Sequence, residues 1–512
     1  MRDLLDLKAC ISRGDYAWET LEERGVRVLR HVIFCQNPVT NRYQSMNIYV
    51  PKDYVNSNGS INMDARVNGR SPADAPVIFR NNCSGWFSSD PDMDVGAFTV
   101  DDVAAAGWVY VTCGARSRDL GRLGKMPAPI VDLKAGIRFL RQNSGVLPGN
   151  TERIISIGGS GAGEMSSVLG ASGNHPAYLP RLYEIGAAGV TREAGGSYVS
   201  TIRDDVYGCM CFYPITDIEN ADLAYAWTRF DSGETQVKLG GGGQTGTAVF
   251  SPFKLALQND MAERFVRYIN DLGLRSLTGE PLSFDGPRQG SYYRQILENI
   301  SAALDAYMRT NGLGEGWLID RCGEGGKLPL WLERRDGGYA VTDLAGFLND
   351  TGLKRNKDIP GFDTFWKTME NNGFGGDRQT AAHYAPLTAE VLRDNYARYK
   401  TLPGFEACDA DDYIREPGNG PVPEQTRLMN STHLLLANAR EEKLSDPAPF
   451  WRIRSGTADE HTSFSVGYNL ALAARENPGV QVDYSLVWDM PHGGELEGDS
   501  TGTFRQWAEC IL

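Results

Sequence analysis

A serine stands in the middle of a glycine-rich turn, where its hydroxyl could act as a nucleophile. The turn follows a β-rich run, precedes a helix-like segment and contains Gly158-Gly-Ser160-Gly-Ala-Gly. In a nucleophile elbow the serine occupies so tight a turn between strand and helix that its neighbours must be small. Gly158 and Gly161 meet this requirement, and Ala162 replaces the second glycine of Gly-x-Ser-x-Gly. The turn therefore predicts Ser160 as a nucleophile for acyl transfer.

A base and an orienting acid follow this serine in the order that the α/β-hydrolase fold uses, which is Ser, then Asp or Glu, then His. His492 lies just past the last strand-like run, and Asp459 lies in the loop after the preceding run. Two alternatives remain open at this point, Asp489 as the acid and His461 as the base. They are weaker because Asp489 belongs to a strand end and His461 shares a short loop with Asp459. We predict a triad of Ser160, His492 and Asp459.

Such a triad also needs two backbone N–H groups that face the oxyanion of the tetrahedral intermediate. We expect one from Gly161 and one from the loop after the β-rich run 76–80, at Cys83 or Ser84. The six histidines are dispersed and the chain has no His-Glu-x-x-His pattern, so we expect neither a metal nor a cofactor.

Dinucleotide binding is the competing interpretation of the glycine-rich turns. Residues 159–163 carry glycines at alternate positions, but Glu164 stands where the third glycine of Gly-x-Gly-x-x-Gly belongs. Residues 241–246 do match the glycine spacing, yet no strand-like run leads into them. We expect an insertion loop there instead.

Short β-rich runs bounded by Gly, Pro or Asn supply the framework for these residues. They occupy residues 46–50, 76–80, 107–112, 153–157, 208–213, 450–454 and 480–488. Residues 130–142 place apolar side chains at helical spacing between two of the runs. This alternation predicts an α/β fold with a mostly parallel sheet and helices on both faces.

The sheet pattern is interrupted after Pro214. Residues 216–445 have few strand-like runs and contain helix-like stretches at 262–272, 292–309 and 388–399. We therefore expect one discontinuous catalytic domain, residues 1–215 and 446–512, and a large, mainly helical lid domain inserted over 216–445.

The composition limits the partners of the chain. Its 512 residues carry a formal charge of −14, with 41% hydrophobic and 23% charged residues, which is typical of a globular protein. An acidic chain is a poor candidate for coating nucleic acid or an anionic membrane. No apolar run is long enough to span a membrane, so we expect a cytoplasmic protein, although a removed signal peptide would leave the same pattern.

Several longer motifs resemble bacterial tannases of subtype B, in the tannase and feruloyl esterase group of the α/β-hydrolases. The motifs run through most of the chain and include Met46-Asn-Ile-Tyr-Val-Pro, Gly114-Ala-Arg-Ser-Arg, Leu147-Pro-Gly-Asn, Pro214-Ile-Thr-Asp and Ala221-Asp-Leu-Ala-Tyr-Ala-Trp. Fungal tannases and feruloyl esterases place cysteines beside the catalytic serine and histidine, where this chain has Gly159 and Gly493.

The resemblance implies hydrolysis of galloyl or related phenolic esters, with a lid lysine and glutamate that hold the ring hydroxyls. Lys357 and Glu370 lie in the two segments that resemble those positions. Where these tannases carry an aspartate two residues beyond the triad acid, this chain has His461. An imidazole differs from a carboxylate in charge, size and titration range, which leaves the preferred acyl group open.

The first hypothesis is thus a serine esterase that acts on a small-molecule phenolic ester. A triad determines the reaction class but not the leaving group, so a general carboxylesterase or a peptidase of the same fold is the alternative. A catalytically silent pseudo-hydrolase that only binds ligands is the alternative from a different class.

Overall fold

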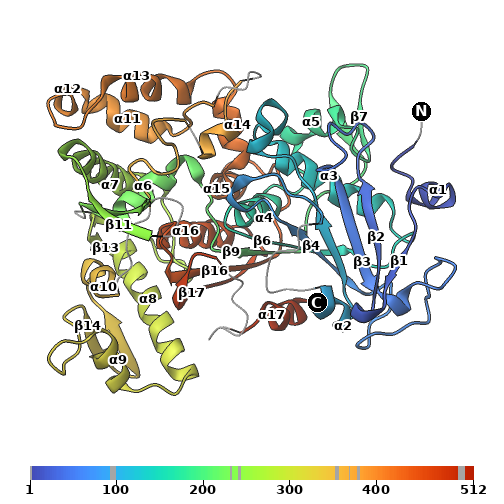
Figure 1. Ribbon diagram of the computed structural model, residues 1–512, viewed down its shortest axis with the longest axis horizontal. Helices are drawn as coiled ribbons and strands as arrows, with labels where there is room; N and C mark the ends of the chain where they lie inside the picture. The colour runs from blue at the N-terminus through green and yellow to red at the C-terminus, as the bar shows by residue number, and fades with distance from the viewer. Residues whose placement is uncertain are drawn as a thin grey trace.

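The nine strands of one large sheet hold the structure together (Figure 1). The structure is a computed structural model that describes residues 3–92, 100–230, 233–239, 244–351, 357–367, 369–376, 381–493 and 502–512. Within these residues the strand order is β1-β2-β3-β5-β4-β6-β9-β16-β17. The strands are β1 (Glu19–Leu21), β2 (Val26–Ile33), β3 (Ser45–Pro51), β4 (Pro76–Asn81), β5 (Val109–Cys113), β6 (Asn150–Gly159), β9 (Gly208–Phe212), β16 (Phe450–Ala458) and β17 (Gln481–Pro491).

The sheet is mostly parallel, as predicted. It begins with antiparallel pairings from β1 through β3 to β5, and then continues in parallel pairings to β17. Every strand-like run of the sequence lies in this sheet. Strand β2 was not predicted, because charged and exposed residues such as Arg30 and His31 interrupt its apolar positions.

Helices cover both faces of the sheet, which confirms the predicted α/β-hydrolase architecture. Side chains of a strand alternate between the faces, and in β4 Val77 and Phe79 belong to one apolar core while Ile78 belongs to the other. The first core includes helices α3 (Ala128–Gln142), α4 (Gly161–Ala171) and α16 (Phe464–Arg475). The second includes α2 (Val100–Ala105) and α17 (Phe504–Ile511).

The segment between β9 and β16 contains most of the remaining helices. Figure 1 shows it gathered beside the β16–β17 end of the sheet, to the left in that view. Its helices are α6 (Ile218–Thr228), α7 (Pro252–Leu272), α8 (Ser291–Thr310), α9 (Glu315–Cys322), α10 (Leu344–Asp350), α11 (Pro386–Asp394), α12 (Tyr396–Tyr399), α13 (Ala407–Arg415), α14 (Val422–Met429) and α15 (Ser431–Arg440). The division into a catalytic domain, 1–215 and 446–512, and a lid domain, 216–445, stays a prediction.

Short hairpins and peripheral elements complete the fold. Three two-stranded hairpins within 216–445 were missed by the sequence patterns: β10 (Glu234–Leu239) with β11 (Gln244–Val249), β12 (Phe284–Gly286) with β13 (Gln289–Gly290), and β14 (Leu332–Arg335) with β15 (Gly338–Val341). The elements outside that segment are α1 (Leu7–Ser12), α5 (Leu179–Glu184), β7 (Val190–Arg192) and β8 (Tyr198–Ser200). The glycine run at residues 240–243 lies outside the described residues.

No helix in the described part of the chain combines the length and the apolar character that crossing a membrane would require.

Candidate active site

Ser160 occupies a sharp turn between the end of β6 and the start of α4. Its φ is +59°, a left-handed conformation that is rare for a residue with a side chain. The neighbouring glycines make the turn possible. A Cβ at Gly158 would lie 2.2 Å from the carbonyl oxygen of Ala162, and a Cβ at Gly161 would lie 2.7 Å from the backbone nitrogen of Trp86. Side chains are therefore excluded on both sides of the serine.

His492 lies within hydrogen-bond distance of both other residues of the predicted triad. The Ser160 Oγ lies 2.8 Å from Nε2 of His492, whose Nδ1 lies 2.9 Å and 3.0 Å from the two carboxylate oxygens of Asp459. An ionised carboxylate can only accept, so Nδ1 must carry the proton. Nε2 is then the acceptor, and the serine hydroxyl donates to it.

The pairing of β16 with β17 delivers the acid and the base to the same place. The two strands are parallel, with Ala458 opposite Pro491, so Asp459 and His492 emerge side by side at the carboxyl edge of the sheet. Asp459 is 3% exposed. It also accepts hydrogen bonds from the backbone N–H of His461, at 2.8 Å, and of the next residue. These bonds fix the carboxylate that orients the imidazole.

The alternative acid, Asp489, and the alternative base, His461, do not take the places of Asp459 and His492 in this chain of hydrogen bonds. The carboxylate of Asp489 receives two hydrogen bonds from the guanidinium of Arg321, at 2.7 Å and 2.8 Å, and is exposed. His461 packs its ring against that of His492, with 4.6 Å between the centroids, and its Nε2 lies 3.6 Å from Glu460. His461 therefore lies beside the candidate base.

The loop expected to complete the oxyanion hole packs directly against the elbow. It contains the short 3₁₀ helix η3 (Ser84–Trp86). The Cys83 N–H already donates to Oδ1 of Asn81, at 3.4 Å. Within the described residues we find no acceptor for the N–H of Ser84. Of the two candidates in this loop, Ser84 is the one whose N–H is not already bonded among the described residues, which makes it the stronger candidate beside Gly161.

A hydrogen bond ties this loop to the helix that follows the serine. The indole N–H of Trp86 donates to Oε2 of Glu164, on the first turn of α4. Both side chains are buried, and the backbone of Gly85 and Trp86 is left-handed, with φ of +60° and +55°. Burial raises the pKa of Glu164 well above its ordinary value, and Glu219 adds to the effect. The hydrogen bond between Trp86 and Glu164 sets the position of the oxyanion loop relative to α4.

Buried carboxylates hold the segment that contains Lys357 and Glu370. Asp222 of α6 accepts hydrogen bonds from three consecutive backbone N–H groups, those of Gly361, Phe362 and Asp363, at 2.6–3.1 Å. The Lys357 ammonium lies 4.3 Å from the ring centroid of Phe362. The segment is therefore anchored to α6 midway between the two residues.

Glu370 is 4% exposed, and its Oε2 has no hydrogen-bond partner. Burial raises the pKa of Glu370, while the charges of Lys357 and Arg118 lower it. The two lid residues implied by the resemblance thus lie close enough to interact, as does an arginine that was not predicted. The sequence missed Arg118, although the motif Gly114-Ala-Arg-Ser-Arg contains it; Trp86 and Glu164 gave no signal of their own.

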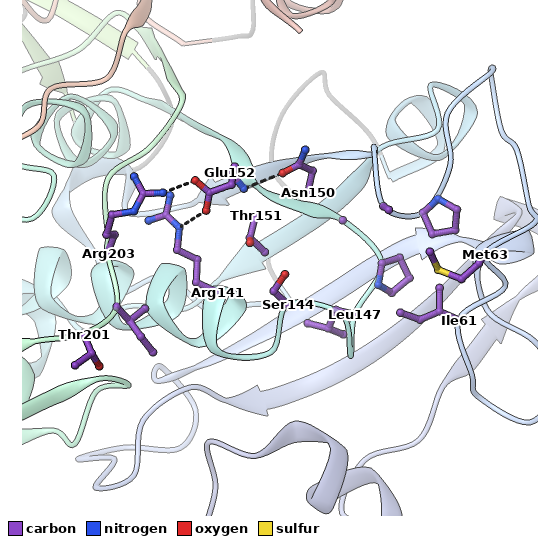
Figure 2. Close-up of a pocket in the computed structure, with 16 residues that line it drawn as sticks. Ile61, Met63, Arg141, Ser144, Leu147, Asn150, Thr151, Glu152, Thr201 and Arg203 are labelled. Atoms are coloured by element: carbon purple, nitrogen blue, oxygen red, sulfur yellow. Dashed lines mark hydrogen bonds and ion pairs between the residues drawn. The ribbon is translucent and has the colours of Figure 1, made fainter.

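A pocket at the opposite edge of the sheet is not part of this site (Figure 2). It encloses about 630 Å³ around the start of β6. Since β6 has ten residues, the pocket lies roughly 30 Å along the strand from Ser160. Its charged side chains pair with one another, because Glu152 contacts both Arg141 and Arg203, as the dashed lines in Figure 2 show.

Comparisons with known proteins point to an esterase. The native tannin acyl hydrolase of Lactobacillus plantarum is 26% identical to this chain, with a TM-score of 0.75, and the match covers 97% of each chain. A tannase of Fusobacterium nucleatum is 25% identical, with a TM-score of 0.74 and coverage of 97% of this chain and 98% of that one. A tannin acyl hydrolase in complex with ethyl gallate is 26% identical, with a TM-score of 0.72 and coverage of 97% and 96%.

The BD-FAE family model matches residues 63–241. No curated protein sequence matches the chain. BD-FAE is an esterase family, and the solved structures extend the similarity over nearly the whole chain. The predicted resemblance to bacterial tannases is confirmed.

Proposed function

The chain is a carboxylic ester hydrolase of the α/β-hydrolase fold, and we propose that it hydrolyses aromatic, phenolic esters through Ser160, His492 and Asp459. The observation that carries the proposal is the unbroken chain of hydrogen bonds from the Ser160 hydroxyl through the imidazole to the buried carboxylate. A serine hydroxyl is a weak nucleophile unless a base accepts its proton, and this arrangement provides that base.

The geometry supports a two-step reaction. Ser160 Oγ attacks the ester carbonyl carbon while His492 Nε2 takes the hydroxyl proton, and Asp459 stabilises the imidazolium. The oxyanion of the tetrahedral intermediate then accepts hydrogen bonds from the N–H groups of Gly161 and Ser84. Collapse breaks the bond to the leaving alcohol, to which His492 returns the proton. Water hydrolyses the acyl-enzyme by the same steps.

The phenolic substrate class rests on the relatives and on the composition of the site. Related structures contain ethyl gallate and 3,4-dihydroxybenzoate. In this chain Lys357 and Glu370 supply a donor and an acceptor for ring hydroxyls, and His461 contributes an imidazole beside the triad base. We propose these three residues as substrate-binding residues.

The test compares wild type and Ser160→Ala with methyl gallate, methyl ferulate, p-nitrophenyl acetate and a panel of peptides. We expect Ser160-dependent turnover that favours the two phenolic esters, and a loss of about 10³-fold or more in kcat for the variant. Activity that survives the substitution would exclude the serine mechanism. Ester turnover without phenolic preference would indicate a general carboxylesterase, peptide cleavage would indicate a peptidase, and binding without turnover would indicate a pseudo-hydrolase.

A further inference from the structure

Arg118 is a buried cation whose guanidinium is not fully satisfied by the protein. It begins the 3₁₀ helix η4 (Arg118–Gly124) and is 6% exposed. Its Nε and Nη1 are buried and have no hydrogen-bond partner. A buried charged group without partners costs free energy, so such groups in native proteins call for an explanation. A ligand that supplies the missing acceptor is one.

Arg118 packs on the residue that follows the candidate oxyanion loop. Phe87 follows η3 directly, and the Arg118 guanidinium lies 4.4 Å from the centroid of its ring. The adjacent residues are tied together, because Asp119 accepts hydrogen bonds from the N–H and the hydroxyl of Ser88, at 2.6 Å and 2.8 Å. One short stretch therefore contains the candidate oxyanion donor Ser84 and the aromatic surface on which Arg118 rests.

A second unsatisfied group interacts with this arginine. The Oε2 atom of Glu370 is buried and has no hydrogen-bond partner. The Glu370 carboxyl also interacts electrostatically with Arg118. Hydrogen bonds join the segment after Arg118 to the segment after Glu370. The backbone N–H of Met126 donates to the carbonyl oxygen of Gly373 at 2.8 Å, and the Lys125 ammonium donates to two carbonyl oxygens of the second segment. Arg118 and Glu370 interact electrostatically, yet form no ion pair.

We propose that Arg118 and Glu370 together bind one phenolic hydroxyl of the acyl ring, with Arg118 donating to its oxygen. This inference rests on the proposed function and deepens it. A phenolic hydroxyl can accept from a guanidinium and also bond to a carboxyl, so it satisfies both groups at once. A methoxy oxygen can only accept, and an unsubstituted ring does neither. A site with buried polar groups rejects substrates that leave those groups unpaired.

The experiment measures kcat/KM of wild type and Arg118→Met for methyl 3,4-dihydroxybenzoate, methyl 3,4-dimethoxybenzoate and methyl benzoate. We expect the wild type to prefer the dihydroxy ester. In Arg118→Met the ratio of dihydroxybenzoate to benzoate should fall by about 10-fold to 100-fold, because a hydrogen bond to a charged group is lost. Arg118→Lys, which keeps the charge without the planar donor set, should give an intermediate ratio.

The matched control is Arg122→Met, which removes an exposed arginine from the same short helix and should leave the ratio at the wild-type value. If Arg118→Met does not fold, as judged by circular dichroism, the ratio in Arg118→Lys decides. An unchanged ratio in a folded Arg118 variant would overturn the assignment while the proposed function stands. A wild type that hydrolyses p-nitrophenyl acetate through Ser160 but neither the three benzoates nor methyl gallate and methyl ferulate would overturn both.

Discussion

Arg116 and Arg118 are two residues apart, both buried, and differ completely in their surroundings. The guanidinium of Arg116 binds Asp132 through two hydrogen bonds, at 2.8 Å and 2.9 Å, and donates a third to the carbonyl oxygen of Leu123. Arg118 leaves two nitrogens without partners. A buried charge that is fully paired belongs to the framework, whereas one that remains unsatisfied beside a candidate active site indicates a place for a ligand.

The largest effect is expected from breaking the paired arginine. Arg116→Met would leave Asp132 buried without its cation, which should lower the free energy of unfolding by about 3–5 kcal/mol. Arg118→Met removes no ion pair: it loses a desolvated contact with the Phe87 ring, worth about 2 kcal/mol, and relieves an unsatisfied buried charge, so the net loss of stability should be at most about 2 kcal/mol. Urea denaturation of both variants tests the difference. Equal losses of stability would mean that Arg118 is also a framework residue.

A smaller effect is expected at Glu164, whose Oε2 accepts a hydrogen bond while its buried Oε1 has no partner. Glu164→Leu removes the acceptor of the Trp86 indole, so the oxyanion loop should shift relative to α4. We expect kcat to fall by about 10²-fold, comparable to the loss of one oxyanion donor, with little change in KM. Glu164→Gln keeps an acceptor oxygen and should restore most of kcat.

Active-site titration with a serine-reactive phosphonate separates this effect from a loss of folded protein. A Leu variant whose kcat per titrated site equals that of wild type would show that Glu164 only contributes to stability.

A pH-dependent effect concerns Glu219, a buried carboxyl with one bonded and one unbonded oxygen. Burial, and then the charge of Asp217, raises its pKa from 4.5 to about 8. The folded state therefore keeps a proton that the unfolded state has lost between these values, so this residue lowers stability as the pH rises through that window. Glu219→Gln should abolish this contribution. Unfolding free energies of both proteins at several pH values test it; parallel curves would contradict the assignment.

The sequence predicts the parts of this site that depend on local pattern and on order along the chain. Gly158, Ser160 and Gly161 define a turn that few other residue types could form, and Asp459 and His492 follow strand-like runs at the right places. Strand β2 escaped prediction because exposed charges obscure its alternation.

The remaining features depend on contacts between distant segments. The choice between Cys83 and Ser84 follows from the orientation of the Asn81 side chain. The different roles of Arg116 and Arg118 follow from Asp132 and Glu370, which reach them from other elements. No spacing rule distinguishes two arginines in one motif.

The order of the strands has a consequence for biosynthesis. β9 ends at Phe212, but its neighbour β16 begins only at Phe450. While the ribosome makes the intervening residues, β9 has one edge without a partner, and unpaired edges of apolar strands invite aggregation. The nucleophile is likewise complete long before its base is translated. Ser160 of a nascent chain therefore has no base to activate it until the final strand, β17, is in place.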